Sequence, residues 1–179
     1  MKEYITEAIV LSRMPLREED FVASLFTKDL GRIEARVVSG RKILSKLSSN
    51  VDFLNHVDVR IVSKNKMILA DVVTKSVFPK LKRHPSRLAT ALRAAHLINS
   101  LLPRELSERR LWHEFARMLQ RGIINMPIIL KILGYDPKGA VCLGCGRNTI
   151  SHFYLVDQIF LCASCSVNPA HNSRDVILI

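Results

Sequence analysis

All four cysteines of this chain lie in one short stretch near the C-terminus, VCLGCGRNTISHFYLVDQIFLCASC, from Val141 to Cys165. They form two C-x2-C pairs separated by sixteen residues, a spacing typical of a four-cysteine zinc site. Gly144 and Gly146 let each turn direct backbone amides toward the sulfurs, so the two turns can place four thiolates about one tetrahedral ion. The sequence therefore predicts one zinc ion held by Cys142, Cys145, Cys162 and Cys165.

These cysteines have three alternative uses: two disulfides, a redox-active dithiol, or an iron site with the same four ligands. Disulfides need an oxidising compartment, and the N-terminal residues MKEYITEAIVLSRM contain no secretory apolar core before a cleavage site. A redox dithiol needs one pair, usually after a strand of a thioredoxin-like fold, and that pattern does not surround Cys142 or Cys162. Four thiolates fill the zinc shell and leave no position for a substrate, so a structural ion is expected and His152 is not needed as a ligand.

The net charge of +11 is unevenly distributed along the 179 residues. Residues 1–80 carry 14 basic and 10 acidic side chains, residues 81–138 carry 11 and 4, and residues 139–179 carry 2 of each. Two windows free of acidic residues, between Glu34 and Asp52 and between Asp71 and Glu105, contain clusters of lysine and arginine. A single basic cluster is usually only a solvated surface. Two such windows in a chain with a pI near 9.9 indicate a polyanionic partner, and nucleic acid is the favoured candidate.

Residues 3–78 have the pattern of a small β-barrel. Five short segments rich in Val, Ile, Leu and Phe are separated by turn-like breaks such as KDLG and SKNK. In RIEARVV, Ile33, Ala35 and Val37 share one face of the predicted strand, and the other face is shared by Arg32, Glu34, Arg36 and Val38. An antiparallel barrel of the OB type is predicted, and an SH3-like barrel would have a similar composition. The break GRKILSKLSSN, residues 40–50, is expected to be a functional loop at the barrel rim.

Helical periodicity begins after Pro79 and continues to the first cysteine pair. Three helices are predicted: one near a Ser86 cap, one from a Ser107 cap to Gly122, and one between Pro127 and Gly134. Trp112, on the second helix, is interpreted as a packing anchor. The expected fold is α+β, with an OB-type barrel over residues 1–79, a helical region over 80–138 and a four-cysteine zinc module with a tail over 139–179.

The sequence contains none of the common catalytic motifs: no P-loop, no G-x-S-x-G, no H-E-x-x-H and no Gly-rich dinucleotide fingerprint. The longest uncharged apolar runs are too short to span a bilayer. We therefore expect a cytoplasmic protein with no enzymatic activity, no small-molecule substrate and no membrane partner.

The order of these features resembles the RecO family of bacterial recombination mediators. Residues 7–42, EAIVLSRMPLREEDFVASLFTKDLGRIEARVVSGRK, are similar to the opening of that family, and residues 129–146, ILKILGYDPKGAVCLGCG, are similar to its helix end and first zinc knuckle. The chain departs from the family in length, because only fourteen residues follow Cys165.

The resemblance implies a protein of the nucleoid that binds single- and double-stranded DNA and anneals complementary strands. It also implies partnership with RecR and with single-stranded DNA-binding protein during the loading of RecA. By position, the family's DNA contacts carry over to Arg32, Arg36, Arg41, Lys42 and Lys46. The second basic window adds Arg83 and Arg87, which are expected one helical turn apart. Two other hypotheses are kept: a zinc-ribbon or transcription-type adaptor that acts through protein contacts, and a dithiol redox enzyme.

Overall fold

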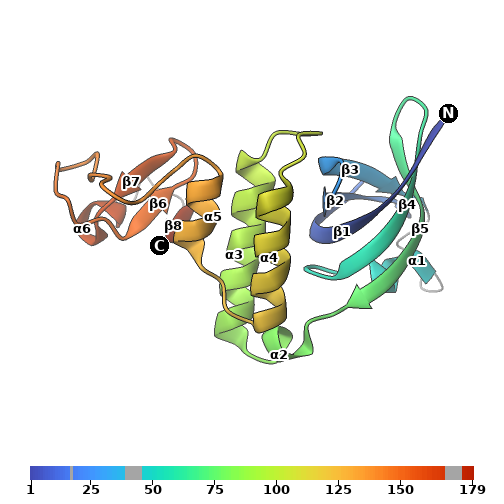
Figure 1. The fold of residues 1–179 in the computed structure, drawn as a ribbon, viewed down its shortest axis with the longest axis horizontal. Helices are drawn as coiled ribbons and strands as arrows, with labels where there is room; N and C mark the ends of the chain where they lie inside the picture. Colours follow the sequence, from blue (N-terminus) through green and yellow to red (C-terminus); the bar gives the residue numbers. More distant parts are fainter. Residues whose placement is uncertain (17, 39–45, 168–174) are drawn as a thin grey trace. The chain divides into compact units, whose positions relative to one another are not determined.

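The computed structural model describes residues 1–16, 18–38, 46–167 and 175–179, and the backbone alone of Lys46. The described residues form two compact units, Met1–Ile124 and Asn125–Ile179. The barrel and the helices that directly follow it belong to the first unit, and the four cysteines belong to the second (Figure 1). The predicted boundaries after residues 79 and 138 stay predictions.

The first unit contains a closed five-stranded barrel with the strand order β1-β2-β3-β5-β4. Antiparallel ladders join all neighbours except β3 and β5, which pair in parallel through Arg36 and Ile68. This topology is the OB type and confirms the predicted class of barrel. The barrel elements are β1 (Lys2–Pro15), β2 (Phe21–Thr27), β3 (Gly31–Val37), α1 (Lys46–Asn50), β4 (His56–Ser63) and β5 (Met67–Ser76).

The barrel interior is built from alternate residues of each strand, because successive side chains of a strand point to opposite faces. In β3, Ile33, Ala35 and Val37 are buried while Arg32 and the other two polar side chains are partly exposed, as predicted from the alternation. These residues join Leu25 and other aliphatic side chains in one core cluster. Burial of this apolar surface is the main force that holds the strands in register.

Three helices follow the barrel in the first unit, α2 (Pro79–Lys82), α3 (Pro85–Leu101) and α4 (Arg109–Arg121). Trp112 of α4 is 4% exposed and its indole donates a hydrogen bond to the Phe26 carbonyl at 3.1 Å, so it anchors α4 on β2. On α3, Asn99 accepts a hydrogen bond of 2.6 Å from Ser24. Both helices therefore pack against the barrel wall, with polar bonds that set their positions.

The predicted helix starts need two corrections, whereas the predicted stop is confirmed. The N-cap residues are His84 for α3 and Glu108 for α4, and neither side chain makes a capping hydrogen bond. Proline at the first position of α3 has its φ already set for a helix, which explains a start before Ser86. Helix α4 ends at Gly122, whose φ of 70° suits glycine.

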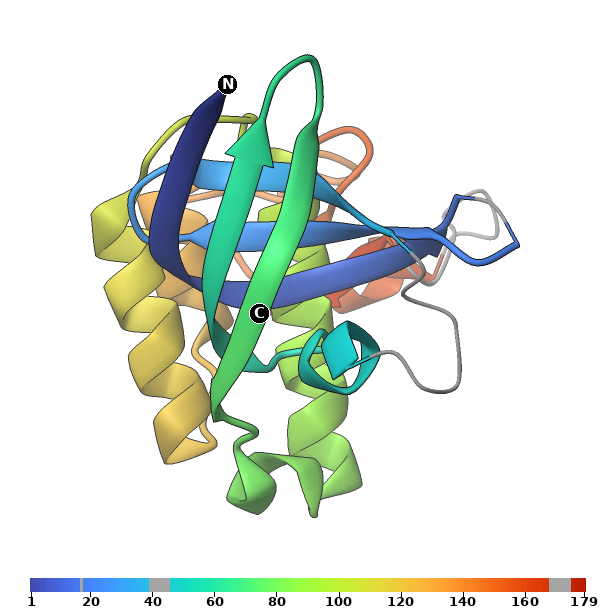
Figure 2. The ribbon, with the colours of Figure 1, turned by 90° about the vertical axis from the view of Figure 1, so that its right-hand side faces the viewer.

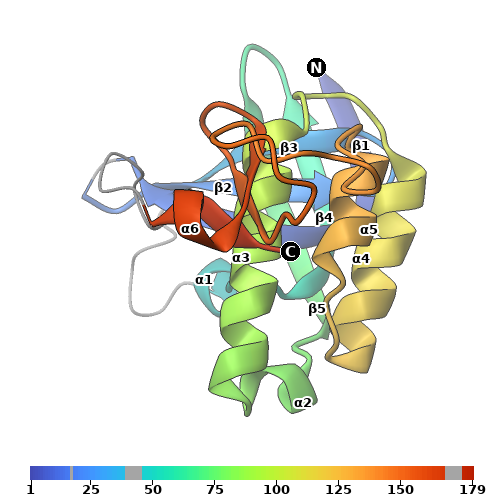
Figure 3. The ribbon, with the colours of Figure 1, turned by 90° about the vertical axis from the view of Figure 1, so that its left-hand side faces the viewer.

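The second unit contains one helix and a small sheet around the cysteines. Its elements are α5 (Met126–Ile132), β6 (His152–Tyr154), β7 (Ile159–Leu161), α6 (Ala163–Ser166) and β8 (Val176–Leu178). The sheet order is β7-β6-β8, and α6, which is labelled in Figure 3, contacts both β6 and β7. Helix α5 begins at an Asn125 cap that accepts a bond from the Ile128 amide, and Gly134 follows its end with a φ of 96°. The predicted third helix is thereby confirmed.

None of the helices in the described ranges is both long and apolar enough to cross a membrane.

Candidate nucleic-acid interface and metal centre

A groove of about 810 Å³ opens at one end of the barrel. Its wall includes Val22 of β2 and Ile33 of β3, and Leu16 lies on it just before the break that leads to β2. The β4–β5 turn closes one side with residues 63–67. The face of strands 2 and 3, together with the loops between strands 1 and 2 and strands 4 and 5, is where OB-folds bind oligonucleotides. The groove therefore lies at the position of an OB ligand site.

Basic side chains outnumber acidic ones around this groove, five to two. The carboxylates are Glu34 and Glu105, and the bases are Lys2, Arg36, Lys64, Lys66 and Arg104. Within the described part of the chain, the three lysines form no ion pair and are exposed. Unpaired lysines at the rim of a concave site raise the local potential and attract polyanions. The sequence analysis did not assign these lysines to the DNA-binding surface. Two of them lie in the SKNK turn, which could have been recognised as a binding loop once the strands on either side of it were assigned to an OB barrel.

The segment after α3 forms the remaining wall of the groove by lying along β3. The Glu105 amide donates to the Arg32 carbonyl at 2.9 Å, and residues 32 and 104 form a parallel bridge. A Cβ on Gly31 would lie 2.1 Å from the Leu106 carbonyl oxygen, and the φ of Gly31 is +72°. Only glycine allows this close approach, which brings Arg104 to the groove.

Two predicted DNA contacts of β3 have partners within the chain. The Arg32 side chain is 12% exposed, and its Nε donates to the Leu102 carbonyl at 2.8 Å at the end of α3. Arg36 lines the groove and donates from Nε to Asp20 at 2.9 Å. Their role in DNA binding stays a prediction. To contact a phosphate, each guanidinium would have to bind it in addition to, or in place of, the acceptor that it binds within the chain.

The other predicted contacts lie in two further places. Arg41 and Lys42 fall outside the described residues, and so does the side chain of Lys46. Arg83 is the C-cap of α2 and Arg87 lies in the first turn of α3, and both are exposed. Figure 2 shows α2 at the opposite end of the barrel unit from the β4–β5 turn. The two arginines are not one turn apart on a continuous helix, because the extended backbone of His84 (φ −111°, ψ 104°) separates α2 from α3.

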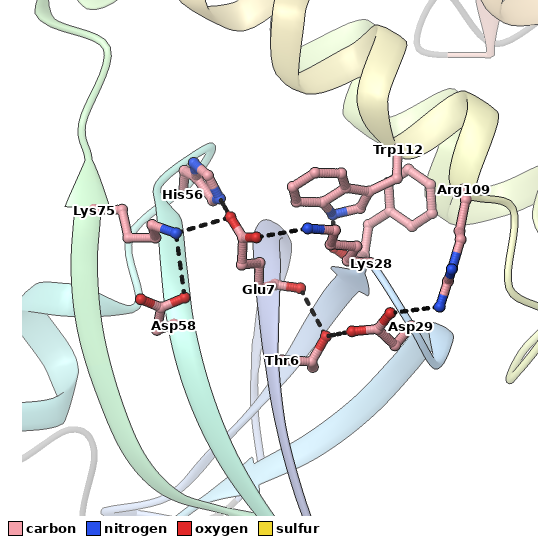
Figure 4. Close-up of polar contacts among 10 residues, drawn as sticks. Thr6, Glu7, Lys28, Asp29, His56, Asp58, Lys75, Arg109 and Trp112 are labelled. Carbon is pink, nitrogen blue, oxygen red and sulfur yellow. Dashed lines mark hydrogen bonds and ion pairs between the residues drawn. The ribbon is translucent and has the colours of Figure 1, made fainter.

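A charged network on the barrel wall is centred on Glu7 of β1 (Figure 4). Its carboxylate accepts hydrogen bonds from Lys28 at 2.9 Å, Lys75 at 2.9 Å and His56 at 3.0 Å. The hydrogen bonds from Lys75 and then Lys28 lower the pKa of Glu7 from 4.5 to about 2. Burial lowers the pKa of His56 despite the nearby carboxylate, so His56 is neutral at pH 7 and donates its Nε2 proton to Glu7. The Lys28 ammonium also lies 5.6 Å from the Trp112 ring, which links the network to α4.

Replacement of Glu7 is expected to remove a pH-dependent part of the stability. Because the folded pKa is depressed, the ionised carboxylate stabilises the protein fully above about pH 4.5, and this stabilisation is lost as the pH falls toward about 2. Glu7→Gln should lower the free energy of unfolding at pH 7 by up to about 3 kcal/mol and flatten its pH dependence in this window. Urea unfolding at several pH values measures both effects.

Glu3→Gln on the same strand is the matched control. Glu3 is 48% exposed and pairs only with Arg60 among the described residues, at 3.3 Å. An exposed pair of this kind contributes about 0–1 kcal/mol. An unchanged pH profile in Glu7→Gln would contradict the central role of Glu7.

The four cysteine sulfurs form a compact cluster in the second unit. Their Sγ atoms all lie within 4.8 Å of one another, and none is in a disulfide. Sγ of Cys145 and Sγ of Cys162 are 3.7 Å apart, close to the edge of about 3.8 Å that a tetrahedron with Zn–S distances of 2.3 Å would have. The geometry fits a tetrahedral metal ion, as the spacing predicted.

Local backbone geometry brings the two cysteine pairs together. The Gly146 amide donates to the Cys142 carbonyl at 2.7 Å and closes the first turn, while the Leu143 amide donates to the Phe160 carbonyl of β7 at 3.0 Å. A Cβ on Gly144 would lie 3.0 Å from the Cys165 sulfur, so a larger residue would crowd the cluster. His152 is not part of the cluster, and its Nδ1 lies 2.8 Å from the Ser151 hydroxyl.

The ionisation of these thiols also suits a cation. The pKa of Cys142 is lowered to about 6, first by the backbone amide of Cys162. The pKa of Cys165 is raised to about 12, first by its bond to the Cys162 sulfur and then by the other two sulfurs. The site thus favours a thiolate but resists full ionisation, because four adjacent negative charges repel one another. A divalent cation would remove that repulsion.

Comparisons with known proteins agree with the barrel fold of the first unit. A family model described as Recombination protein O N terminal matches residues 1–74. DNA repair protein RecO of Thermodesulfovibrio yellowstonii is 26% identical over 95% of this chain and 73% of its own length. The RecO proteins of Symbiobacterium thermophilum and Koribacter versatilis are 25% and 28% identical over 84% and 79% of this chain. The chain spans 64% and 63% of the lengths of these two relatives. The barrel topology, the match over residues 1–74 and the similarity along most of the chain agree with the resemblance to the RecO family.

Proposed function

We propose that this protein acts in DNA repair and recombination by binding DNA through the groove of its OB barrel. The observation that carries the proposal is the excess of basic side chains around that groove, with Lys2, Lys64 and Lys66 unpaired within the described residues. Lysines that neutralise phosphates release counterions and bind without reading the base sequence. Tyr4 lies on the wall of the groove and offers an aromatic ring for stacking against a base of a single strand.

The proposed activity is that of a mediator with no catalytic residues. It binds single- and double-stranded DNA, anneals complementary strands and, together with RecR, loads RecA on DNA coated by single-stranded DNA-binding protein. The bases assigned from the sequence are also proposed to contact DNA. They are Arg32, Arg36, Arg41, Lys42, Lys46, Arg83 and Arg87. The proposed location is the cytoplasm, in association with the nucleoid.

The second unit is proposed to hold one structural zinc ion through Cys142, Cys145, Cys162 and Cys165. The ion would supply no chemistry to DNA binding, because four thiolates complete its shell. Its contribution is to the folding of the unit, since metal binding by scattered cysteines is coupled to structure.

The salt dependence of single-stranded DNA binding tests the proposal. If four of the assigned bases contact phosphates, log K should fall with log salt with a slope of about −3, from about −0.7 for each contact. Fluorescence anisotropy with a labelled oligonucleotide between about 50 and 200 mM salt measures the slope. Binding that is absent at low salt, or that does not change with salt, would contradict phosphate recognition.

A second candidate function is supported by an apolar pocket of about 480 Å³ beside the cysteine cluster. Leu143 and Val167 on its wall are 70% and 78% exposed. Such a pocket is the kind of site that binds an apolar side chain of another protein, as an adaptor would. Substitution of Leu143 by Ser should then weaken a protein complex and leave DNA affinity unchanged.

A further inference from the structure

A second cluster of unpaired bases lies in the first unit, away from the groove. Lys80 of α2, Arg83 after it and Arg87 in the first turn of α3 are exposed and form no ion pair within the described part of the chain. Lys82 differs, because its ammonium is held by Asp52 at 3.1 Å and by Asn55 at 2.9 Å. Arg87 also lines a shallow pocket of about 200 Å³ with Thr90 and residues 122–124. We call Lys80, Arg83 and Arg87 the α2–α3 cluster.

The groove and the α2–α3 cluster lie at opposite ends of strand β5. Residues 64–66 directly precede β5, and α2 begins three residues after it ends at Ser76. Figure 2 shows the β4–β5 turn at the top of the barrel and α2 at the bottom. A strand of ten residues spans about 30 Å at about 3.3 Å per residue. The two basic surfaces are therefore separated by about three Debye lengths at 0.1 M salt.

The barrel face between these surfaces does not continue the positive charge. On the outer side of β1, β4 and β5, lysine and arginine are matched with carboxylates in ion pairs. These pairs are Arg60 with Glu3, Lys75 with Glu7 and Lys75 with Asp58. Asp71 is a further acidic residue exposed on β5. A phosphate backbone would gain little along this face, so the two basic surfaces are separate sites and not the ends of one track.

We infer that the first unit holds two nucleic-acid strands at the same time, one in the groove and one on the α2–α3 cluster. The inference rests on the proposed function and specifies how one molecule could bring two strands together. Because salt screens charges beyond about 10 Å at 0.1 M, two strands about 30 Å apart on the protein repel each other only weakly. Each site binds phosphates, so the two strands need not be complementary.

A capture experiment with two non-complementary oligonucleotides tests this inference. A biotinylated oligothymidine of about ten nucleotides, within the range of OB-fold site sizes, is immobilised and loaded with protein. A fluorescent oligothymidine of the same length is then added, and retained fluorescence reports a second bound strand. The unaltered chain should retain the second strand. The variant Arg83→Glu with Arg87→Glu should still bind the first strand, but its retained fluorescence should be roughly tenfold lower than that of the unaltered chain.

Lys64→Glu with Lys66→Glu is the matched variant at the other end, with the same change in charge. It should also bind one strand and lose capture of the second. Arg83→Gln with Arg87→Gln should give a smaller loss than the reversal, and melting curves check that each variant is folded. Full retention by Arg83→Glu with Arg87→Glu would overturn the inference, because a dimer that used two grooves would keep capture in that variant.

The same assay separates this inference from the proposed function. Failure of the unaltered chain to bind the first oligonucleotide at low salt would overturn the proposed function. Binding of the first strand without capture of the second would overturn only the two-site inference.

Discussion

Replacement of Cys142 by serine is expected to abolish zinc binding and to unfold the second unit. Cys142 is fully buried, and its sulfur is one of four that lie within 4.8 Å of one another. The small sheet around the cluster has three strands of three residues each, which is too little apolar surface for independent stability. Zinc binding contributes an apparent 10–16 kcal/mol in small structural sites, so it would dominate the folding of this unit.

Zinc content by elemental analysis and amide hydrogen exchange measure this result. The variant should fall from about one zinc ion per chain to none, and amides of β6 and β7 should lose their protection. Affinity for DNA should stay nearly unchanged, because the groove belongs to the first unit.

His152→Ala is the matched control for the loss of a ligand in the second unit. His152 lies between the cysteine pairs but outside the sulfur cluster, so this variant should keep its zinc. Retention of zinc by Cys142→Ser, or loss of zinc by His152→Ala, would contradict the assigned ligand set. A selective loss of DNA binding in folded Cys142→Ser protein would show that the cysteine module takes part in recognition.

Reversal of two charges at the groove, Lys64→Glu with Lys66→Glu, is expected to weaken binding of single-stranded DNA to the groove by roughly 100-fold at low salt, which leaves only the binding at the α2–α3 cluster. Both lysines lie on the β4–β5 turn and are exposed without an ion pair within the described residues. The change removes two attractive contacts with phosphate and adds two repulsive ones. The salt slope should also become shallower by about 1.4, at about 0.7 for each lost contact.

Arg93→Glu with Lys138→Glu is the control with the same change in net charge. Both side chains are exposed and neither lines the groove. Anisotropy titrations of the two variants separate a local effect from an effect of total charge. Equal losses of affinity in both variants would mean that the total charge governs binding. An unchanged affinity in Lys64→Glu with Lys66→Glu would exclude the groove as the DNA-binding site.

The cluster of four cysteines was predictable from the sequence because its members are close along the chain. Two C-x2-C turns already constrain each pair of sulfurs, and the sixteen intervening residues are long enough for a hairpin that returns the second pair to the first. The structure brings all four together through β6 and β7, as the spacing indicated. The barrel was also predictable, because the alternation in β3 is a local property of the strand.

The groove was not predictable to the same extent because its residues come from distant segments. Lys2, Lys64 and Arg104 meet only when β1, the β4–β5 turn and the segment after α3 are assembled. The assignment of Arg32, made by its position in the family resemblance, could not include its bond to the Leu102 carbonyl, because that contact forms only in the folded chain. Likewise, the helix that follows Arg83 begins after an extended His84, which separates two arginines that the periodicity placed on one helix.

By itself, the sequence determined the grouping of the four cysteines, the class of barrel and the anchoring role of Trp112. Each depends on a short-range pattern: ligand spacing, alternation along a strand, and an indole on an amphipathic helix. Only the tertiary structure decided which bases are unpaired and which line a concave surface. The physical reason is that ion pairing and burial depend on side chains that are far apart in the chain, and long-range packing alone brings them within reach.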